Sequence, residues 1–386
     1  MENDLSRITR FRKILDESSM NFKKFVDEIE LNNWNVFGTE VYINGELKYS
    51  YGDTTGLHEI YSATKTILSI AVGVFFDEGM IDLDRPITDY LPQDKVKAMV
   101  EKQYNSFNKI SIRRLLTMSV KGFPFRPQGD NWLDYSLACE INPDDTGFDY
   151  SNVGVYLVGV ALANILGDDL GRFIEERILK PLNITSYEYG RSPEGYFYGA
   201  SQMRLSVHDL SKFGLLLYNK GVYNGNRIIS EAYVDMATSR QQINREGGYG
   251  FYIWKYRGGF SINGKWKQKC YVLPKLGVIV TFLSNIDDDS NALIESMEKN
   301  IFGIGLKEKK AFERIEKMEE LFDKVKNGNR NEQYLNILEK YYTSDDWKTD
   351  FSLDESGLLP ANLKCGVLSE DGIYNLLFSV QNQTMI

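Results

Sequence analysis

The spacing of hydrophobic positions changes from one segment of this chain to the next, and it predicts helices and strands. Residues 19–33 carry apolar side chains at helical intervals, which is typical of an amphipathic helix. Residues 153–166 are almost all apolar, so we expect a buried helix there. Residues 38–43 and 46–51 flank an Asn-Gly pair, which is a strong signal for a β-hairpin.

The later part of the chain returns to strands after a long helical region that is interrupted by prolines. We expect helices at residues 209–219 and 288–302, and strands at residues 250–256, 269–272 and 276–283. Strands at both ends with helices between them indicate one sheet assembled from both ends. The predicted fold class is α+β, with an antiparallel sheet flanked by helices and an inserted, mainly helical region at about residues 84–200.

Residues 304–386 differ in character from the region before them. Two charged helices are expected at residues 306–327 and 331–342, and a short irregular or β tail follows. We therefore predict one domain over residues 1–303 and a C-terminal helical extension of unknown function over residues 304–386. The extension is also the segment through which a homo-oligomer could form.

Composition and charge narrow the class of protein. The net charge of −9 and the pI near 5.1 argue against nucleic-acid binding. Three widely spaced cysteines, Cys139, Cys270 and Cys365, show neither a disulfide framework nor metal-ligand spacing, which suits a reducing compartment. No signal peptide or membrane-spanning stretch is apparent. We expect a cytoplasmic protein with no membrane partner.

Ser62 and Lys65 stand at the head of the apolar pattern of residues 67–76. Side chains three apart on a helix share one face, so the hydroxyl and the amine are expected to be neighbours. The start of a helix favours developing negative charge, and the same field lowers the pKa of a lysine from about 10.4. The pair is a candidate nucleophile and base. Spacing alone is weak support, because Ser106 and Lys109 repeat it in polar surroundings.

A second polar group precedes the apolar segment at residues 153–166. Tyr150 and Asn152 are two positions apart and point the same way if the chain is extended there. Together with Ser62 and Lys65 they suggest a mechanism. Ser62 would attack, Lys65 and Tyr150 would relay its proton, and Asn152 would orient the lysine or the substrate.

The two histidines of the chain are weaker candidates. His208 follows Ser206 in a segment typical of a capped helix start, which favours a structural role. His58 precedes Ser62 by four positions, and a loop histidine is usually solvated.

These motifs, in this order, resemble the serine β-lactamase and penicillin-binding-protein superfamily, in its Tyr-x-Asn (class C-like) branch. The resemblance covers about residues 20–303. Further matches to the family pattern lie at residues 77–87, 110–118 ("tiRhLLtM"), 148–159 ("F-x-YSN-x-G"), 180–185 ("PLGM-T") and 209–214 ("DLAKFG"). The Leu-Leu-Thr-Met form, with Trp132 and Leu133 before the Tyr-Ser-Asn block, is similar to the subgroup of 6-aminohexanoate-dimer hydrolases and related esterases.

The third family motif departs from its usual Lys/His-Thr/Ser-Gly form. By position it falls at Ile262-Asn263-Gly264, so the basic residue is missing. The resemblance implies that Asn263 and Gly264 position the substrate. It also implies an oxyanion hole formed by the backbone N–H groups of Ser62 and Lys265. Backbone donors tolerate side-chain change, so the hole is expected to survive the departure.

The resemblance implies a serine hydrolase that acts through an acyl-enzyme on a small ester or amide, without metal or cofactor. Two alternatives remain open at this point. One is a catalytically degenerate penicillin-binding-like protein that binds a peptide or peptidoglycan-like ligand, which the altered third motif favours. The other is a scaffold whose extension at residues 304–386 docks a partner.

Overall fold

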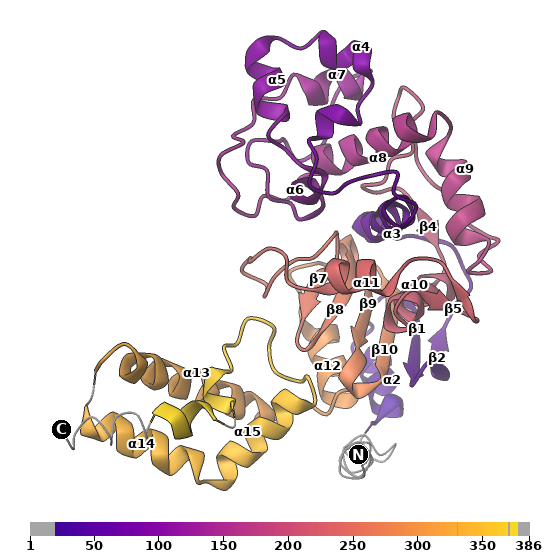
Figure 1. Cartoon of the computed structure of the whole chain (residues 1–386). Coiled ribbons are helices and arrows are strands. Elements are labelled where there is room, and N and C mark those ends of the chain that lie inside the picture. The colour runs from indigo at the N-terminus through magenta and orange to yellow at the C-terminus, as the bar shows by residue number, and fades with distance from the viewer. Residues whose placement is uncertain (1–19, 330, 370, 377–386) are drawn as a thin grey trace. The chain divides into compact units, whose positions relative to one another are not determined.

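The computed structural model of the chain describes residues 20–329, 331–369 and 371–376 (Figure 1). The chain divides into two compact units. The larger unit comprises residues 35–289, and the smaller one joins residues 1–34 to residues 290–386.

A six-stranded antiparallel sheet with the strand order β2-β1-β10-β9-β8-β7 lies in the larger unit. Its strands are β1 (Val36–Ile43), β2 (Glu46–Gly52), β7 (Trp254–Tyr256), β8 (Gly259–Gly264), β9 (Gln268–Leu273) and β10 (Val278–Ser284). Strand β1 pairs with β10, where Val41 lies opposite Val280, so the first hairpin joins strands from more than 200 residues later. The prediction of an α+β fold whose sheet is built from both ends of the core is confirmed.

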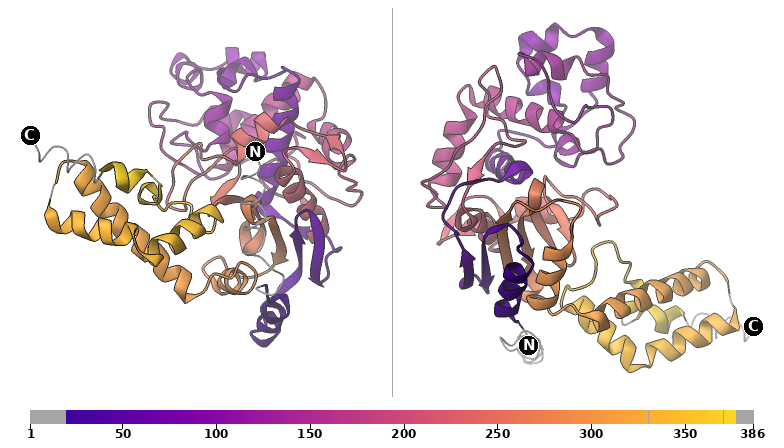
Figure 2. Two further views of the ribbon diagram at one scale, coloured as in Figure 1. Left: turned by 60° about the horizontal axis from the view of Figure 1, so that its bottom comes forward. Right: turned by 180° about the vertical axis from the view of Figure 1, so that it is seen from behind.

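Helices surround this sheet and fill the inserted region. The longer ones are α3 (Thr64–Asp77), α8 (Asn152–Leu166), α10 (Val207–Tyr218) and α11 (Glu231–Thr238). The shorter ones are α4 (Gln93–Lys97), α5 (Glu101–Phe107), α6 (Ile112–Leu116), α7 (Trp132–Leu137) and α9 (Leu170–Ile174). Helix α10 packs closely on the sheet, because a Cβ at Gly214 would lie 2.5 Å from Cys270 Sγ on β9. Helices α4 to α9 lie beyond one end of the sheet, with α3 between them and the strands (Figures 1 and 2).

Two small ribbons complete the larger unit. Strand β3 (His58–Glu59) pairs with β4 (Arg204–Leu205), and β5 (Val222–Tyr223) pairs with β6 (Asn226–Arg227). In the part of the chain that the structure describes, no single helix is both long and apolar enough to cross a bilayer. One pair of helical segments, Asn152–Leu166 with Leu170–Leu179, passes the same test only when taken together, and it bends by 86°.

The strand predicted at residues 250–256 is largely wrong, because only Trp254–Tyr256 joins the sheet as β7. The backbone before it bonds elsewhere. The N–H of Phe251 donates to the Ala237 carbonyl, and that of Tyr252 donates to the Leu116 carbonyl. Tyr252 also has a left-handed φ of 58°, which interrupts an extended strand.

The smaller unit contains only helices within its described residues. Helix α2 (Phe22–Leu31) meets α12 (Ala292–Asn300) through a bond of 2.6 Å from Ser296 Oγ to the Glu28 carboxylate. Helices α13 (Leu306–Lys326), α14 (Glu332–Tyr342) and α15 (Asp345–Glu355) follow. Their core includes Ile315, Phe322, Val325, Leu338, Tyr341, Leu359 and Val367.

The tail after α14 differs from the irregular or β segment that the sequence suggested. Residues Asp345–Glu355 form α15, and the Ser344 side chain caps it by accepting a bond from the Trp347 N–H. Helix α15 is amphipathic only weakly, so its short apolar pattern did not stand out in the sequence. The residues after 376 lie outside the described part of the chain.

Candidate active site

Ser62 and Lys65 lie in contact at the start of α3. A one-turn 3-10 helix, η1 (Tyr61–Ala63), leads directly into α3 and contains Ser62. Lys65 Nζ lies 2.9 Å from Ser62 Oγ and donates a bond of 2.7 Å to the Ala200 carbonyl. Tyr61, just before the serine, has a left-handed φ of 47°, which is uncommon for a residue with a side chain and marks a sharp turn.

The Lys65 side chain is enclosed, with 1% of its surface exposed. Burial penalises the charged form of the amine and holds the pKa of Lys65 well below its usual range. A neutral amine has a free lone pair, and the nearest hydroxyl is that of Ser62. The contact can therefore carry a proton from the serine to the lysine.

Tyr150 lies beside the same amine. Lys65 Nζ is 4.9 Å from the centroid of the Tyr150 ring. Burial raises the pKa of Tyr150, and a hydrogen bond with Ser62 opposes part of that rise. Tyr150 is therefore a phenol at neutral pH and can donate a proton next to the Ser62 hydroxyl.

Asn152 and Asn263 each present an unpaired oxygen. Asn152 is the first residue of α8, after Ser151, whose side chain caps the helix by accepting a bond from the Val153 N–H. Among the described residues, the Oδ1 atoms of both asparagines are buried and have no hydrogen-bond partner. Buried polar atoms in proteins are normally paired. Among the described residues these two oxygens are therefore unused acceptors.

The end of strand β8 approaches the serine turn closely at Gly264. A Cβ at this position would lie 2.1 Å from the Ile60 carbonyl oxygen, two residues before Ser62. Only glycine permits this approach. Lys265 follows as the first residue of the turn η4 (Lys265–Lys267), so its backbone N–H lies next to the segment that holds Ser62.

A buried glutamine holds the η4 turn in place. Gln268 Nε2 donates to the carbonyls of Lys265 at 3.0 Å, Trp266 at 3.1 Å and Ser284 at 2.6 Å, and Gln268 Oε1 accepts from the Ser284 N–H at 3.0 Å. Trp266 and Lys267 both have left-handed φ angles, of 61° and 60°. The Gln268 hydrogen bonds stabilise this turn, whose left-handed backbone angles are unfavourable for residues with a side chain.

The third-motif position is apolar in structure as in sequence. Ile262 is fully buried in the hydrophobic core and lies opposite Cys270 in the pairing of β8 with β9. The neighbouring Lys265 is exposed, and its Nζ lies 4.7 Å from the centroid of the Trp266 ring. Ile262 itself therefore supplies no basic group, and Lys269 on β9 lies opposite the adjacent Asn263.

The other candidates from the sequence have different partners. Ser106 Oγ donates to the Lys102 carbonyl at 3.0 Å, and Lys109 pairs with Asp144 at 3.2 Å, so the second Ser-x-x-Lys match forms no dyad. His58 stacks on Phe37 with ring centroids 3.9 Å apart.

His208 belongs to a separate cluster. Ser206 caps α10 by accepting from the Asp209 N–H, as the sequence indicated. The His208 Nδ1 atom lies 3.0 Å from a carboxylate oxygen of the buried Glu40 on β1.

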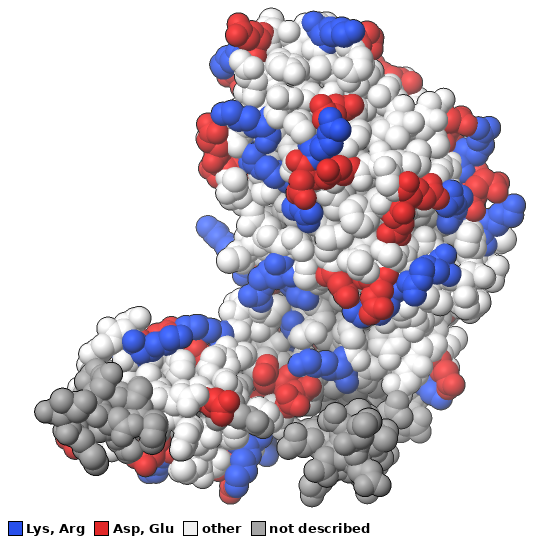
Figure 3. Space-filling model, viewed as in Figure 1, with Lys and Arg blue, Asp and Glu red and all other residues white. Residues whose placement is uncertain are grey.

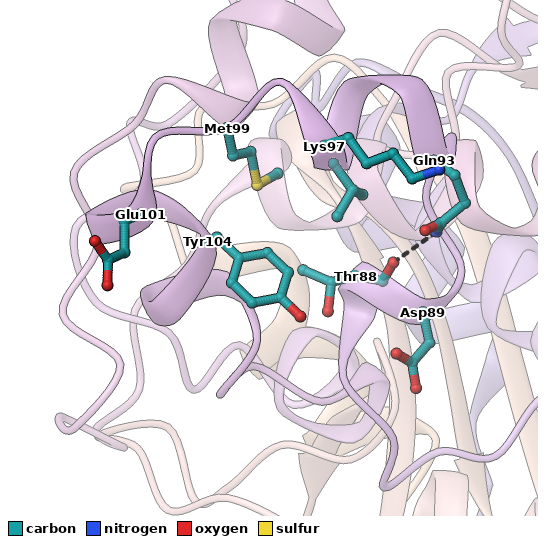
Figure 4. Close-up of a pocket in the computed structure, with 8 residues that line it drawn as sticks. Thr88, Asp89, Gln93, Lys97, Met99, Glu101 and Tyr104 are labelled. Atoms are coloured by element: carbon teal, nitrogen blue, oxygen red, sulfur yellow. Dashed lines mark hydrogen bonds between the residues drawn. The ribbon is translucent and has the colours of Figure 1, made fainter.

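A cavity of about 420 Å³ lies elsewhere, among η2 (Ile87–Asp89), α4 and α5 (Figure 4). Gln93 Nε2 crosses it to donate to the Thr88 carbonyl at 3.0 Å. Its lining contains none of the predicted site residues and no serine or cysteine. It carries none of the chemistry found at Ser62.

Sequence reasoning missed two features of the site. The Ala200 carbonyl, which accepts from Lys65, is a backbone group and leaves no signal in the residue type. The aromatic side chains Phe125 and Trp254 lie against Tyr150 and come from segments distant in sequence. Only the tertiary structure brings them together.

The fold and the Ser-x-x-Lys turn beside the end of strand β8 define a β-lactamase-like protein. The sequence model of the family described as Beta-lactamase matches residues 41–297. This chain belongs to that family. Residues 294–386 match a second family, described as Domain of unknown function (DUF4298).

Solved structures are similar to the chain over most of the same region. A protein from Bacillus anthracis, assigned as a 6-aminohexanoate-dimer hydrolase, is 20% identical with a TM-score of 0.59, over 71% of this chain and 80% of that one. A family VIII carboxylesterase is 15% identical with a TM-score of 0.59, over 73% and 95%. A penicillin-binding-protein homologue from Caulobacter crescentus is 16% identical with a TM-score of 0.56, over 73% and 96%. At these identities the similarity establishes the fold.

Proposed function

We propose that this protein is a serine hydrolase that cleaves a small ester or amide through an acyl-enzyme. The observation that carries the proposal is the contact of 2.9 Å between Ser62 Oγ and the enclosed Lys65 amine, whose pKa burial lowers. A nucleophile needs a base that can accept its proton, and burial of Lys65 shifts the amine towards its neutral form.

In the proposed reaction, Ser62 Oγ attacks the substrate carbonyl while Lys65 Nζ accepts its proton. The tetrahedral oxyanion is stabilised by the backbone N–H groups of Ser62 and Lys265. Tyr150 then passes a proton to the leaving alcohol or amine as the bond between that group and the acyl carbon breaks. The proton held by Lys65 passes to Tyr150, so both groups are restored in the acyl-enzyme. In the second half of the reaction, water attacks the acyl carbon and gives a proton to the Lys65–Tyr150 pair. The ester bond to Ser62 Oγ then breaks, the acid leaves, and the pair returns the proton to Ser62.

Asn152 and Asn263 are proposed to position the substrate. Their buried Oδ1 atoms lack partners among the described residues and can accept hydrogen bonds from a bound molecule. Gly264 is proposed to act through its lack of a side chain, which lets the end of β8 lie against the turn that contains Ser62.

The test is labelling by a fluorophosphonate probe followed by mass mapping of the modified residue. We expect the label on Ser62, and we expect Ser62→Ala to lose both labelling and turnover of p-nitrophenyl acetate. Ser106→Ala is the matched control, because Ser106 has the same Ser-x-x-Lys spacing but bonds to the Lys102 carbonyl. Labelling of Ser106, or turnover by Ser62→Ala, would disprove the assignment.

The second candidate function is a non-catalytic binder of a peptide or peptidoglycan-like ligand. The buried Ile262 at the third-motif position is the observation that favours it. Two probes used together separate the two functions. A binder retains a fluorescent penicillin reversibly and shows no reaction with fluorophosphonate, whereas the proposed hydrolase is labelled covalently by fluorophosphonate.

A further inference from the structure

Phe125 is an exposed aromatic residue held rigidly beside Tyr150. Its side chain is 62% exposed, although large apolar side chains are usually buried. The backbone around it is clamped to the start of α8. The Asn152 N–H donates to the Phe125 carbonyl at 2.7 Å, and Ser151 Oγ donates to the Pro124 carbonyl at 2.6 Å. The ring is therefore presented to solvent from a fixed backbone.

Three aromatic rings form a continuous surface with Tyr150 in the middle. The Phe125 and Tyr150 centroids are 6.4 Å apart with planes 25° from parallel, and the Tyr150 and Trp254 centroids are 5.9 Å apart at 24°. The buried Tyr249 packs edge-on against both Tyr150 and Trp254, at 6.5 and 4.8 Å. The inner rings are thus fixed by packing, and Phe125 is the exposed member of the row.

A second exposed apolar side chain comes from the loop before β7. Ile243 is 76% exposed, and the loop that carries it is tied to the segment before Tyr150 by a bond of 2.5 Å from Gln242 Nε2 to the Thr146 carbonyl. Exposed apolar side chains on a loop held in place by such a bond are typical of a recognition surface.

We propose that Phe125 is a specificity-determining residue that selects substrates with an aromatic leaving group. The proposal rests on the hydrolase function proposed above. Tyr150 hands a proton to the leaving atom, so that atom lies at the Tyr150 hydroxyl. The Phe125 ring lies 6.4 Å from the Tyr150 ring, within the distance of about 4.5–7 Å at which aromatic rings pair. A ring attached one carbon beyond the leaving atom is therefore proposed to pair with Phe125.

The test compares benzyl acetate with ethyl acetate, which share the acyl group and have leaving alcohols of similar acidity. The measured quantity is the ratio of the two kcat/KM values. We expect the ratio to favour benzyl acetate in the native protein and to fall about tenfold in Phe125→Ala, the upper range for loss of an aromatic pair. Phe125→Tyr keeps the ring and should restore the ratio.

Tyr104→Ala is the control, because Tyr104 is also an exposed aromatic residue but lies on α5, at the separate cavity of Figure 4. It should leave the ratio unchanged. Fluorophosphonate labelling of Ser62 is measured on every variant. It distinguishes a failure of the Phe125 inference from a failure of the proposed hydrolase function. Labelling and turnover with an unchanged ratio in Phe125→Ala would overturn this inference alone. Absence of labelling and turnover in the native protein would overturn both.

Discussion

At the scale of single residues, the site depends on enclosing an amine without a charged partner at hydrogen-bond distance. The contacts of Lys65 Nζ are a hydroxyl oxygen of Ser62 and a carbonyl oxygen of Ala200. Neither carries a charge that would hold the proton on the lysine. Desolvation therefore determines the direction of the pKa change, and the same burial keeps Tyr150 protonated.

Replacing Lys65 with methionine should abolish activity and stabilise the fold at neutral pH. The pKa of Lys65 is lowered on folding, so the unfolded chain binds more protons between the folded-state pKa and about 10.4. The free energy of unfolding of the native protein therefore rises with pH across that window. Lys65→Met lacks this dependence, so its stability advantage at pH 7 should shrink towards pH 10. Urea unfolding at several pH values measures the difference, and a constant difference would contradict the assigned pKa shift.

Ile262 leads to a prediction about β-lactams. In the lactamases that the sequence resembles, a basic residue at this position helps to hold the substrate carboxylate, and the buried Ile262 does neither that nor proton transfer. A charge-assisted hydrogen bond of about 1.5–3 kcal/mol corresponds to roughly ten- to two-hundredfold in rate. We expect slow or absent nitrocefin turnover and ready hydrolysis of p-nitrophenyl acetate or butyrate. Nitrocefin hydrolysis with kcat/KM of about 10⁴ M⁻¹s⁻¹ or more would refute this.

At the scale of secondary-structure elements, the site is made where the end of β8 meets the turn before α3. Gly264 allows the approach, and Gln268 fixes the turn that follows through its bonds to backbone carbonyls. The oxyanion hole proposed for the backbone N–H groups of Ser62 and Lys265 depends on the contact between the end of β8 and the turn before α3.

Gly264→Ala should therefore impair the site through the backbone. Its Cβ would overlap the Ile60 carbonyl oxygen, which is not a group that can rotate away. We expect the rate of Ser62 labelling to fall by about 10²-fold, the scale of a lost oxyanion donor, together with a lower melting temperature.

Gly159→Ala is the matched control on α8. The nearest atom to its Cβ is the Phe197 carbonyl oxygen at an ordinary 3.4 Å, and alanine is a better helix former than glycine. Labelling should be unchanged in this variant. An unaffected labelling rate in Gly264→Ala would show that the approach of β8 is not needed for reaction.

At the scale of the whole molecule, the larger unit and helices α13 to α15 each have a hydrophobic core of their own. The core of the larger unit runs from Tyr42 to Leu283, and the core of α13 to α15 shares no residue with it. Charges do not separate in the same way. Lys and Arg are interspersed with Asp and Glu over the face seen in Figure 3, so the net charge of −9 is not gathered in one patch there.

Because these two cores are separate, we predict that the reactivity of Ser62 does not depend on the C-terminal helices. Deletion of residues 304–386 should leave the rate of Ser62 labelling within about twofold, as expected when a domain has its own core. The isolated segment should show helical circular dichroism and a cooperative thermal transition. Loss of labelling in a shortened chain that still melts cooperatively would instead assign a working role to this segment.

Local patterns in the sequence were sufficient to predict several secondary-structure elements and one side-chain contact of the site. Residues 38–51 predicted the hairpin because an Asn-Gly turn acts within a few residues. The apolar run before Leu166 predicted the buried helix α8 for the same reason. The spacing of Ser62 and Lys65 predicted their contact, since three positions on a helix bring two side chains to one face.

Other features were decided only by the tertiary structure, because they depend on backbone groups and on packing between distant segments. The Ala200 carbonyl meets Lys65 across 135 positions of sequence, and a carbonyl is present at every residue. The strand expected from residue 250 begins only at Trp254, since the preceding N–H groups found partners in the helical region. The burial that lowers the pKa of Lys65 likewise comes from the surrounding fold, which supplies the chemical environment that a four-residue motif lacks.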